Sequence, residues 1–295
     1  FATAALMGMP ALGITDRNSV AGLVRAMIAA EEVSAQHAPI RLVAGCRLDL
    51  VDGASLLVWP EDLAAWTRLT RLLTTGKARA HAQQGEKGRC FLHWEDVAHH
   101  AEGLVGALVP GLDGARDGEL AWMTDIFGRR RGHVCLTQQR RPDDARRLMR
   151  TAQSARSFGL RPLATNDVLY HRPELRLLQD VVTAIREKCT IDQLGLKRER
   201  SADRCLQPPD EMARRFRDYP DALAAGAAIV ERCTFSLRDL KDQYLYPDEV
   251  VMSGQSPQQA LEKLARRALD ERFGGDPPQA YLDLLAKELA LVAKL

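Results

Sequence analysis

The sequence predicts an α/β fold in which a closed or nearly closed barrel of six or seven strands is followed by a mainly helical segment. Short β-type runs alternate with helical patterns from the start to about residue 170, which is the signature of βαβ units and a largely parallel sheet. Each strand feeds a helix, and this favours a barrel over an open sheet. From about residue 174 the pattern changes to helices and irregular linkers. A doubly wound open sheet is the alternative fold.

The first third of the chain contains three predicted strands, at residues 11–15, 41–45 and 55–59. The turn pair Asp52-Gly53 predicts a hairpin between the second and the third strand. A helix is predicted after Ser19, whose hydroxyl can serve as the N-cap. Another is predicted from Pro60 to about residue 74, because proline fits the first turn of a helix. Residues 76–93 are polar and are predicted to form a loop.

The same alternation continues and then gives way to helices. Further strands are predicted at 104–109, 133–137 and 160–165, with helices at 95–101, 119–127 and 142–158. Helices are then expected at 174–186, 211–216 and 221–232, followed by an extended connector at 237–257. A last helical pair, 257–273 and 278–295, is separated by Gly274-Gly275. We therefore predict two domains, residues 1–237 and 238–295.

Composition limits the class of protein. The chain has 295 residues, of which 46% are hydrophobic and 27% charged, and its apolar runs fall short of the roughly 20 residues of a membrane span. A soluble protein is expected. The six cysteines include no C-x-x-C pair, so neither a zinc ribbon nor a disulfide framework is indicated, and a reducing cytoplasm fits. Both ends read as cut within helices, which suggests a fragment of a longer protein. A net charge of +2 alone gives no argument for nucleic acid.

Two carboxylates follow predicted strands, where function sits in barrels of this kind. Asp16 ends the first strand and Asp167 ends the strand at 160–165, so both are candidate ligands of a divalent metal. An Asp after a strand is also often only the N-cap of the next helix. The pair Asp143-Asp144 lies at the start of a predicted helix, where the helix dipole favours acidic residues, and is interpreted as structural.

Two segments carry a family resemblance. The segment from Gly8 to Gly22, GMPALGITDRNSVAG, resembles the "G-x-x-A-L-A-I-T-D-H-G-x-x-x-G" segment of the PHP (polymerase and histidinol phosphatase) domain of bacterial DNA polymerase III α subunits. The segment PLATNDVLYH, from Pro162 to His171, is similar to that family's "A-T-N-D-V-H" segment. The resemblance implies a distorted (β/α)7 barrel followed by the first helices of the polymerase palm.

The chain departs from the family at the metal ligands. Where the family has a His, a Glu and a second His, this sequence has Arg17, Arg47 and Leu169. A guanidinium has no lone pair for a metal and carries the wrong charge beside one, and leucine offers no ligand. We therefore expect no metal in this chain and interpret Asp16 and Asp167 as remnant ligands. His171, two residues beyond the family position, is interpreted as a surface residue.

These departures resemble the damage-inducible, error-prone branch of the C family of DNA polymerases. That resemblance implies mutagenic or translesion DNA synthesis on template-primer DNA and dNTPs by the full-length protein. It also implies Mg²⁺ held by palm carboxylates beyond this chain. Accessory mutagenesis proteins or the sliding clamp are the implied partners, and the chain alone is expected to be inactive in polymerisation.

Two alternatives remain. One is a metal-dependent phosphoesterase or proofreading exonuclease that uses the barrel's own site. The other is a non-catalytic module whose rim arginines Arg17, Arg47 and Arg172 bind a protein or DNA. In either case, buried carboxylates left unpaired would be costly. We therefore predict that Arg17 and Arg47 form an ion-paired plug with Asp16 and Asp167.

Overall fold

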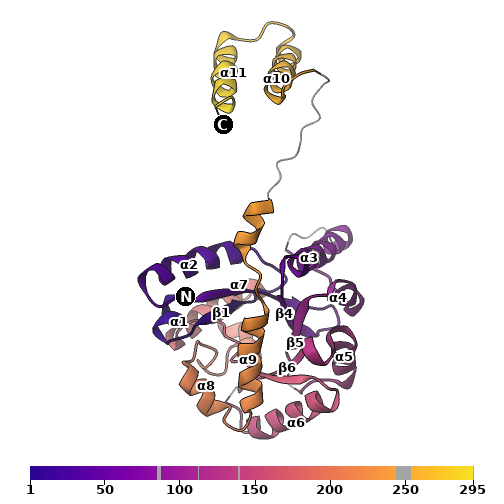
Figure 1. The fold of residues 1–295 in the computed structure, drawn as a ribbon, viewed down its shortest axis with the longest axis vertical. Coiled ribbons are helices and arrows are strands. Elements are labelled where there is room, and N and C mark those ends of the chain that lie inside the picture. Colours follow the sequence, from indigo (N-terminus) through magenta and orange to yellow (C-terminus); the bar gives the residue numbers. More distant parts are fainter. Residues whose placement is uncertain (85–87, 112, 139, 244–253, 295) are drawn as a thin grey trace. The chain divides into compact units, whose positions relative to one another are not determined.

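The structure is a computed structural model that describes residues 1–84, 88–111, 113–138, 140–243 and 254–294. The chain divides into two compact units, Phe1–Asp242 and Gln243–Leu295. The first unit is an α/β structure and the second is helical (Figure 1). The α/β class predicted from the alternating pattern is thus confirmed.

Seven strands form two sheets within the described residues. Helix α1 (Ala2–Leu6) precedes β1 (Ala11–Ile14), and α2 (Leu23–Gln36) connects β1 to its parallel neighbour β2 (Arg41–Ala44). The second sheet has the order β3-β4-β5-β6-β7, in which β3, β4 and β5 pair antiparallel and the remaining pairs are parallel. Its strands are β3 (Cys46–Asp49), β4 (Ser55–Pro60), β5 (Leu104–Leu108), β6 (Gly132–Leu136) and β7 (Arg161–Ala164).

Gly45 is the corner that joins the two sheets. It separates β2 from β3, so one continuous segment pairs with β1 on one side and with β4 on the other. The indole of Trp59 lies against Gly45 so closely that a Cβ atom there would lie 2.6 Å from a ring carbon. Glycine is therefore required at this position for steric reasons.

Helices cover both faces of the larger sheet. Its outer face packs against α3 (Leu63–Gln84), α4 (Trp94–His100) and α5 (Asp117–Arg131). Its inner face, with Leu57, Trp59 and Leu163, packs against α9 (Pro220–Arg232), as Figure 1 shows. Neighbouring strand residues alternate between the two faces, as period-two geometry requires. Among the described strands, the edges are β1 and β2 in the smaller sheet and β3 and β7 in the larger one, and α9 lies along β7.

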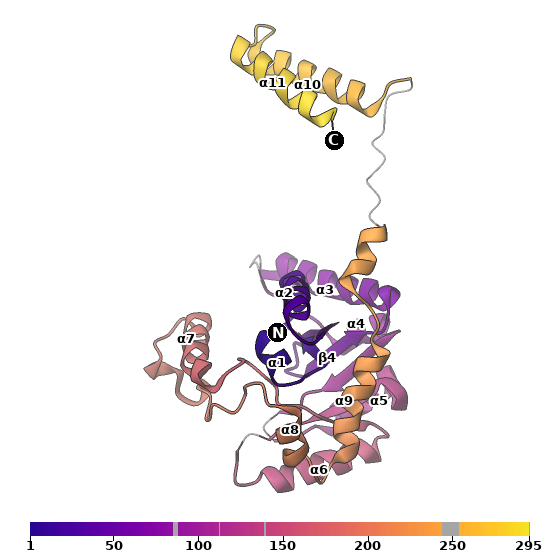
Figure 2. The ribbon, with the colours of Figure 1, turned by 60° about the vertical axis from the view of Figure 1, so that its left-hand side comes forward.

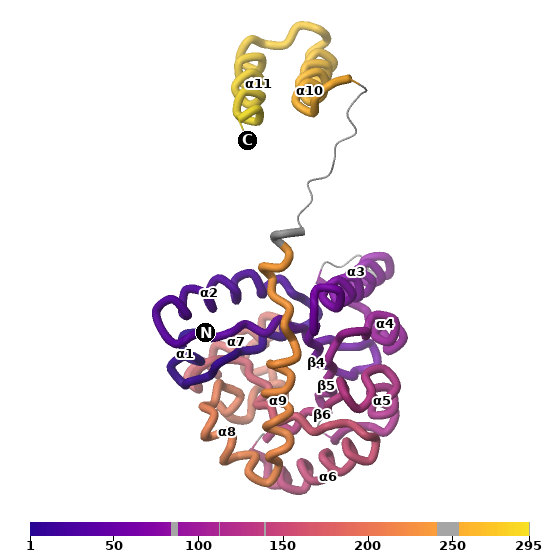
Figure 3. The backbone as a smooth tube through the Cα atoms, in the orientation of Figure 1, coloured from indigo at the N-terminus to yellow at the C-terminus, as the bar shows by residue number. Residues whose placement is uncertain are grey.

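An arm that runs from Asn166 to Cys205 leaves the sheet after β7 and returns to it. It contains three helical elements, which are η1 (Pro173–Leu175), α7 (Arg176–Glu187) and η2 (Asp192–Lys197). Its two ends are tied together by bonds that the Asn166 amide donates to the carbonyls of Asp203 and Cys205, at 2.6 and 2.7 Å. Figure 2 shows α7 standing away from the sheet. The chain then passes through α8 (Pro209–Arg215) to α9 (Figure 3), while α6 (Asp144–Ser157) packs beside β6.

Several local predictions are corrected. Helix α2 begins at Leu23 after Gly22, and the Ser19 hydroxyl instead accepts a bond from Ala21 N–H at 3.2 Å. Pro60 ends β4 and does not open a helix. The predicted hairpin turn is present, but the partner of β4 is β3, a strand that was not predicted.

The loop predicted at 76–93 is also corrected, because α3 continues to Gln84. The guanidinium of Arg79 holds the returning chain against the helix, donating to the carbonyl of Phe91 at 2.7 Å and to Asp96. Tertiary contacts of this kind override the local polar composition. Residues 85–87 of the predicted loop lie outside the described residues.

The second unit is a helical pair. Helix α10 (Pro257–Phe273) starts at a Ser256 capping box and ends at Gly274, whose φ of +65° suits glycine, and α11 (Gln279–Val292) follows. Both predicted helices are confirmed. Of the predicted connector, Leu237–Gln243 forms η3, and residues 244–253 lie outside the described residues. Among the helices described, none has the length and apolar character needed to cross a membrane.

Candidate functional site: an arginine–carboxylate rim

The residues that follow β1 lie beside β3. Arg17 and Arg47 form an isolated parallel bridge, in which Arg47 N–H donates to the Asp16 carbonyl at 2.9 Å and Asn18 N–H donates to the Arg47 carbonyl at 2.7 Å. The backbone therefore fixes the residues that follow β1 beside β3. It brings two guanidinium groups to the edge where the sequence predicted remnant metal ligands.

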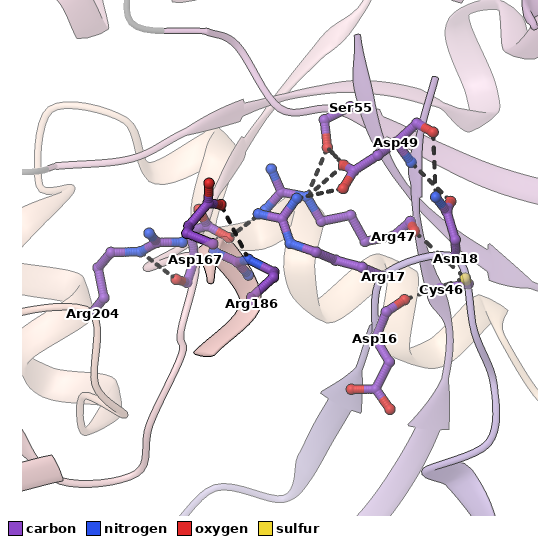
Figure 4. Close-up of polar contacts among 11 residues, drawn as sticks. Asp16, Arg17, Asn18, Cys46, Arg47, Asp49, Ser55, Asp167, Arg186 and Arg204 are labelled. Atoms are coloured by element: carbon purple, nitrogen blue, oxygen red, sulfur yellow. Dashed lines mark hydrogen bonds and ion pairs between the residues drawn. The ribbon is translucent and has the colours of Figure 1, made fainter. Parts of the chain in front are cut away.

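Arg47 connects two carboxylates across this edge (Figure 4). Its Nη1 donates to Asp167 Oδ1 at 3.1 Å, and its Nε donates to Asp49 Oδ1 at 3.3 Å and to the Ser55 hydroxyl at 2.7 Å. The Arg47 side chain is mostly buried. The predicted ion pair between Arg47 and Asp167 is thus present.

Arg17 makes a different ion pair from the one predicted. Its guanidinium pairs with Asp49, and among the described residues it pairs with neither Asp16 nor Asp167. Asp49 also accepts a bond from the Ser55 hydroxyl at 2.6 Å. Burial opposes the charged form of Asp49, but the bond from Ser55 and the charge of Arg17 outweigh burial, so the pKa of this carboxyl is lowered.

Asp16 does not join the network. Figure 4 shows its carboxylate pointing away from Arg17 and Arg47, and no ion pair links it to another described residue. Its side chain lies directly over Gly22, where a Cβ atom would collide with it. The part of the prediction that placed Asp16 in the plug is therefore wrong.

Asp167 is held from a second side by the base of the arm. Arg204 donates to the Asp167 carboxylate at 2.6 Å and to its backbone carbonyl at 2.9 Å, and also pairs with Glu199 at 2.7 Å. The backbone N–H of Leu169 donates to the Arg204 carbonyl at 2.8 Å, which brings this arginine to the rim. Asp167 itself has a φ of +42°, a conformation that Asp tolerates better than most residues.

The network has three participants that were not predicted from the sequence, namely Asp49, Ser55 and Arg204. Asp49 lies two residues after Arg47, and this spacing puts both on the same face once a strand is recognised there. Arg204 lies in an irregular segment where no pattern indicates its position. His171 and Arg172 are exposed, and Asp143 and Asp144 stand at the start of α6 as predicted.

The donor set of the rim does not suit a divalent cation. The Asp167 oxygens accept bonds from Arg47 and Arg204, and the Asp49 oxygens accept bonds from Ser55, Arg47 and Arg17. Within the described residues, no three side chains of His, Cys, Asp or Glu are grouped so that they could hold a metal ion. The arrangement instead presents guanidinium groups, which recognise carboxylate and phosphate oxygens.

Comparisons with known proteins agree with the resemblance seen in the motifs. Residues of this chain are 47% identical over 293 positions to error-prone DNA polymerase 2 of Rhizobium meliloti, covering 99% of this chain and 26% of that protein. Error-prone DNA polymerase 3 of Agrobacterium fabrum is 45% identical over 293 positions, which again cover 99% of this chain and 26% of that protein. The error-prone DNA polymerase of Caulobacter vibrioides is 42% identical over 298 positions, with 99% and 26% covered.

The chain thus spans about a quarter of the length of the curated relatives it matches. Among solved structures, PsfC from Pseudomonas syringae PB-5123 gives a TM-score of 0.35 at 12% identity, covering 56% of this chain and 64% of that one. The family model described as the PHP domain matches residues 1–157. Since this match covers more than half of the chain's 295 residues, the chain belongs to the PHP domain family.

Proposed function

We propose that the chain is a portion of an error-prone DNA-directed DNA polymerase whose PHP unit has replaced its metal site with an internal ion-pair network. Sequence identity of 42–47% over nearly the whole chain to proteins of that name supports the polymerase assignment. Template-primer DNA and dNTPs are the substrates of the longer protein. Its Mg²⁺ ions belong to palm carboxylates outside this chain, and we assign α10 and α11 to the start of that palm.

The observation that carries the metal-free assignment is the place of Arg47. Its guanidinium lies between Asp49 and Asp167, with N–O distances of 3.3 and 3.1 Å. The carboxylate oxygens that a metal ion would need as ligands therefore accept hydrogen bonds from the Arg47 guanidinium instead. Asp16 alone is too few ligands, because Mg²⁺ and Mn²⁺ sites are built from several oxygen ligands in octahedral geometry.

The role that follows for the first unit is mechanical. The ion pair from Arg47 in β3 to Asp167 and the bonds from Arg204 join β3 to the segments that follow β7. We propose that this unit serves as a scaffold for damage-induced translesion synthesis. We place it in the cytoplasm, because its described cysteines are all free thiols. Contact with accessory mutagenesis proteins or the sliding clamp would use the same scaffold.

Metal binding provides the first test. We expect equilibrium dialysis against Mn²⁺, followed by elemental analysis, to find less than one ion per chain. The triple substitution Arg17→His, Arg47→Glu and Leu169→His restores the ligand types of the family and should raise the bound Mn²⁺. Arg146→Glu, on the exposed face of α6, serves as the control for added negative charge. Two or more ions bound by the unaltered chain would overturn the assignment and favour a metal-dependent phosphoesterase.

Primer extension provides the second test. A protein extended to the length of the relatives should add dNTPs to a primer in the presence of Mg²⁺, and this chain alone should not. EDTA should abolish extension by the long protein while leaving the Tm of this chain unchanged, because no metal contributes to its fold. Extension by the chain alone, or a long protein that stays inactive, would contradict the polymerase assignment.

The interaction-module alternative is less well supported by the geometry. Arg47 is engaged with Asp49, Asp167 and Ser55, which leaves only Arg17 and Arg172 exposed for a partner. Binding of duplex DNA that is lost in Arg17→Ala together with Arg172→Ala would revive this alternative.

A further inference from the structure

A pocket of about 190 Å³ opens beside the ion-pair network, at the carboxyl ends of β6 and β7. Four arginines from four different segments line it, namely Arg17, Arg47, Arg147 and Arg204. Arg17 is half exposed at its mouth, whereas the other three are mostly buried. Such a convergence of guanidinium groups on one small space is unusual for a surface whose overall net charge is only +2.

The lining of the pocket carries more positive than negative side chains. Asp167 is the one acidic residue among its described lining residues. The other carboxylates that pair with the four arginines are Asp49, Asp144 and Glu199, and these lie outside the lining. Three of the four pairing acids thus lie outside the pocket, whereas all four guanidinium groups belong to residues that line it.

Two of these donors have no hydrogen-bond partner among the described residues. The Nε of Arg147 is buried and has no hydrogen-bond partner among the described residues, although its Nη2 donates to the Thr137 carbonyl at 2.7 Å and to Asp144 at 2.8 Å. Arg47 donates hydrogen bonds through Nε and Nη1, so its Nη2 has no partner among the described residues. A buried donor without a partner indicates that a further acceptor belongs there.

From this arrangement we infer that the pocket binds a phosphate group without a metal ion. Guanidinium groups present paired N–H donors that match phosphate oxygens, and several around one site supply the charge that a divalent cation would otherwise supply. The hydroxyls of Thr137 and Thr151 on the lining can donate as well. The volume is below the roughly 300 Å³ at which ligand pockets for larger molecules begin. It therefore suits inorganic phosphate, pyrophosphate or a terminal phosphate of a nucleic acid, but not a whole nucleotide.

This inference does not depend on the polymerase assignment, because it concerns only side chains of the first unit. Isothermal titration of the chain in a phosphate-free buffer of constant ionic strength provides the test. The probes are inorganic phosphate, pyrophosphate, and a short single-stranded oligonucleotide with either a 5′-phosphate or a 5′-hydroxyl. We expect saturable binding at one site, weaker for the 5′-hydroxyl than for the 5′-phosphate oligonucleotide.

Two substitutions distinguish binding in the pocket from general attraction of the anion by the positive charge of the protein. Arg17→Gln should weaken binding roughly tenfold, the effect of losing a hydrogen bond to a charged group, and its position at the half-exposed mouth leaves the core intact. Arg147→Gln should weaken it at least as much, with circular dichroism reporting that the variant is folded. Arg150→Gln on the same helix α6 is exposed and outside the pocket lining, so it removes the same charge and should leave binding unchanged.

The probes also distinguish the source of the phosphate. Tight binding of inorganic phosphate or pyrophosphate identifies a free anion, whereas binding confined to the 5′-phosphorylated strand identifies a nucleic-acid end, and either result supports the pocket. Absence of saturable binding by all probes overturns the inference. Equal weakening by Arg17→Gln and Arg150→Gln overturns it too, since binding would then follow net charge alone.

Discussion

Helices α9 and α7 belong to the same unit and bury opposite kinds of face. Helix α9 buries apolar residues, among them Ile229 with 5% of its surface exposed, against the inner face of the sheet. Helix α7 buries Asp180, which is 1% exposed, together with Thr183, while Ile185 on its outer face is 72% exposed. One helix is held by apolar burial and the other by ionic contacts to its own arm.

The difference shows what an amphipathic pattern does and does not determine. A spacing of three and four residues tells which side chains share a face of a helix. Which face is buried depends on what the chain brings beside it. For α7 the neighbouring segment brings Arg198 to 3.6 Å from Asp180, and Arg176 of the same helix lies 3.4 Å from it, so the polar face turns inward.

The largest effect on stability is expected from Ile229→Ala in α9. Its side chain packs against the inner face of the sheet, so the substitution should lower the free energy of unfolding by about 2–5 kcal/mol through lost burial and the cavity left behind. Urea unfolding followed by tryptophan fluorescence measures this, because all four tryptophans lie in the first unit. A loss below about 1 kcal/mol would mean that α9 does not support the core.

Asp180→Ala in α7 is expected to have the next largest effect, about 1–3 kcal/mol, because it removes a buried acceptor and leaves two arginines without their partner. Asp180 also accepts a bond from Glu199 N–H at 3.3 Å, so its loss should loosen the arm. Asp192→Ala, an exposed acid of the same arm, is the control. If both substitutions cost the same in urea unfolding, ionic contacts are not what holds α7.

A third helix, α4, provides a better-formed ion pair for comparison. Asp96 receives two bonds from Arg79, at 2.5 and 2.8 Å, and these bonds together with the charge of Arg79 lower the pKa of Asp96 from 3.8 to about 2. Because the folded-state pKa is the lower one, the pair stabilises the fold above pH 3.8 and ceases to do so as the pH falls towards 2.

Asp96→Asn should therefore destabilise the unit by about 1 kcal/mol at neutral pH, and the difference from the unaltered chain should vanish near pH 2. Thermal unfolding across this pH range measures it, with the exposed Glu95→Gln as the control. A difference that stays constant down to pH 2 would show that the charge of Asp96 plays no part.

The smallest effect is expected from Ile185→Ala, which removes the same atoms as Ile229→Ala but from an exposed position. The free energy of unfolding should change by less than about 0.5 kcal/mol. A cost approaching that of Ile229→Ala would erase the contrast between the two helices and show that the outer face of α7 is covered in solution.

Most strands could be predicted because apolar and β-branched runs alternate clearly with helical patterns, and these strands agree with the structure to within a residue or two. Strand β3 could not, since Arg47 and Asp49 interrupt its apolar pattern with charges. The pairing of Arg47 with Asp167 was predictable from strand-end positions and the cost of an unpaired carboxylate. The pairing of Arg17 with Asp49 was not, because it depends on the unpredicted strand.

The position of α9 also has a consequence in time. Roughly 160 residues separate β4 from α9 along the chain, and at synthesis rates of about 5–20 residues per second the inner face of the sheet waits on the order of ten seconds for its cover. During that interval Leu57 and Trp59 of β4 have no helix over them. The nascent protein therefore presents an apolar sheet face to the cell before it can complete its fold, which makes this stage of synthesis the one most open to chaperones and to aggregation.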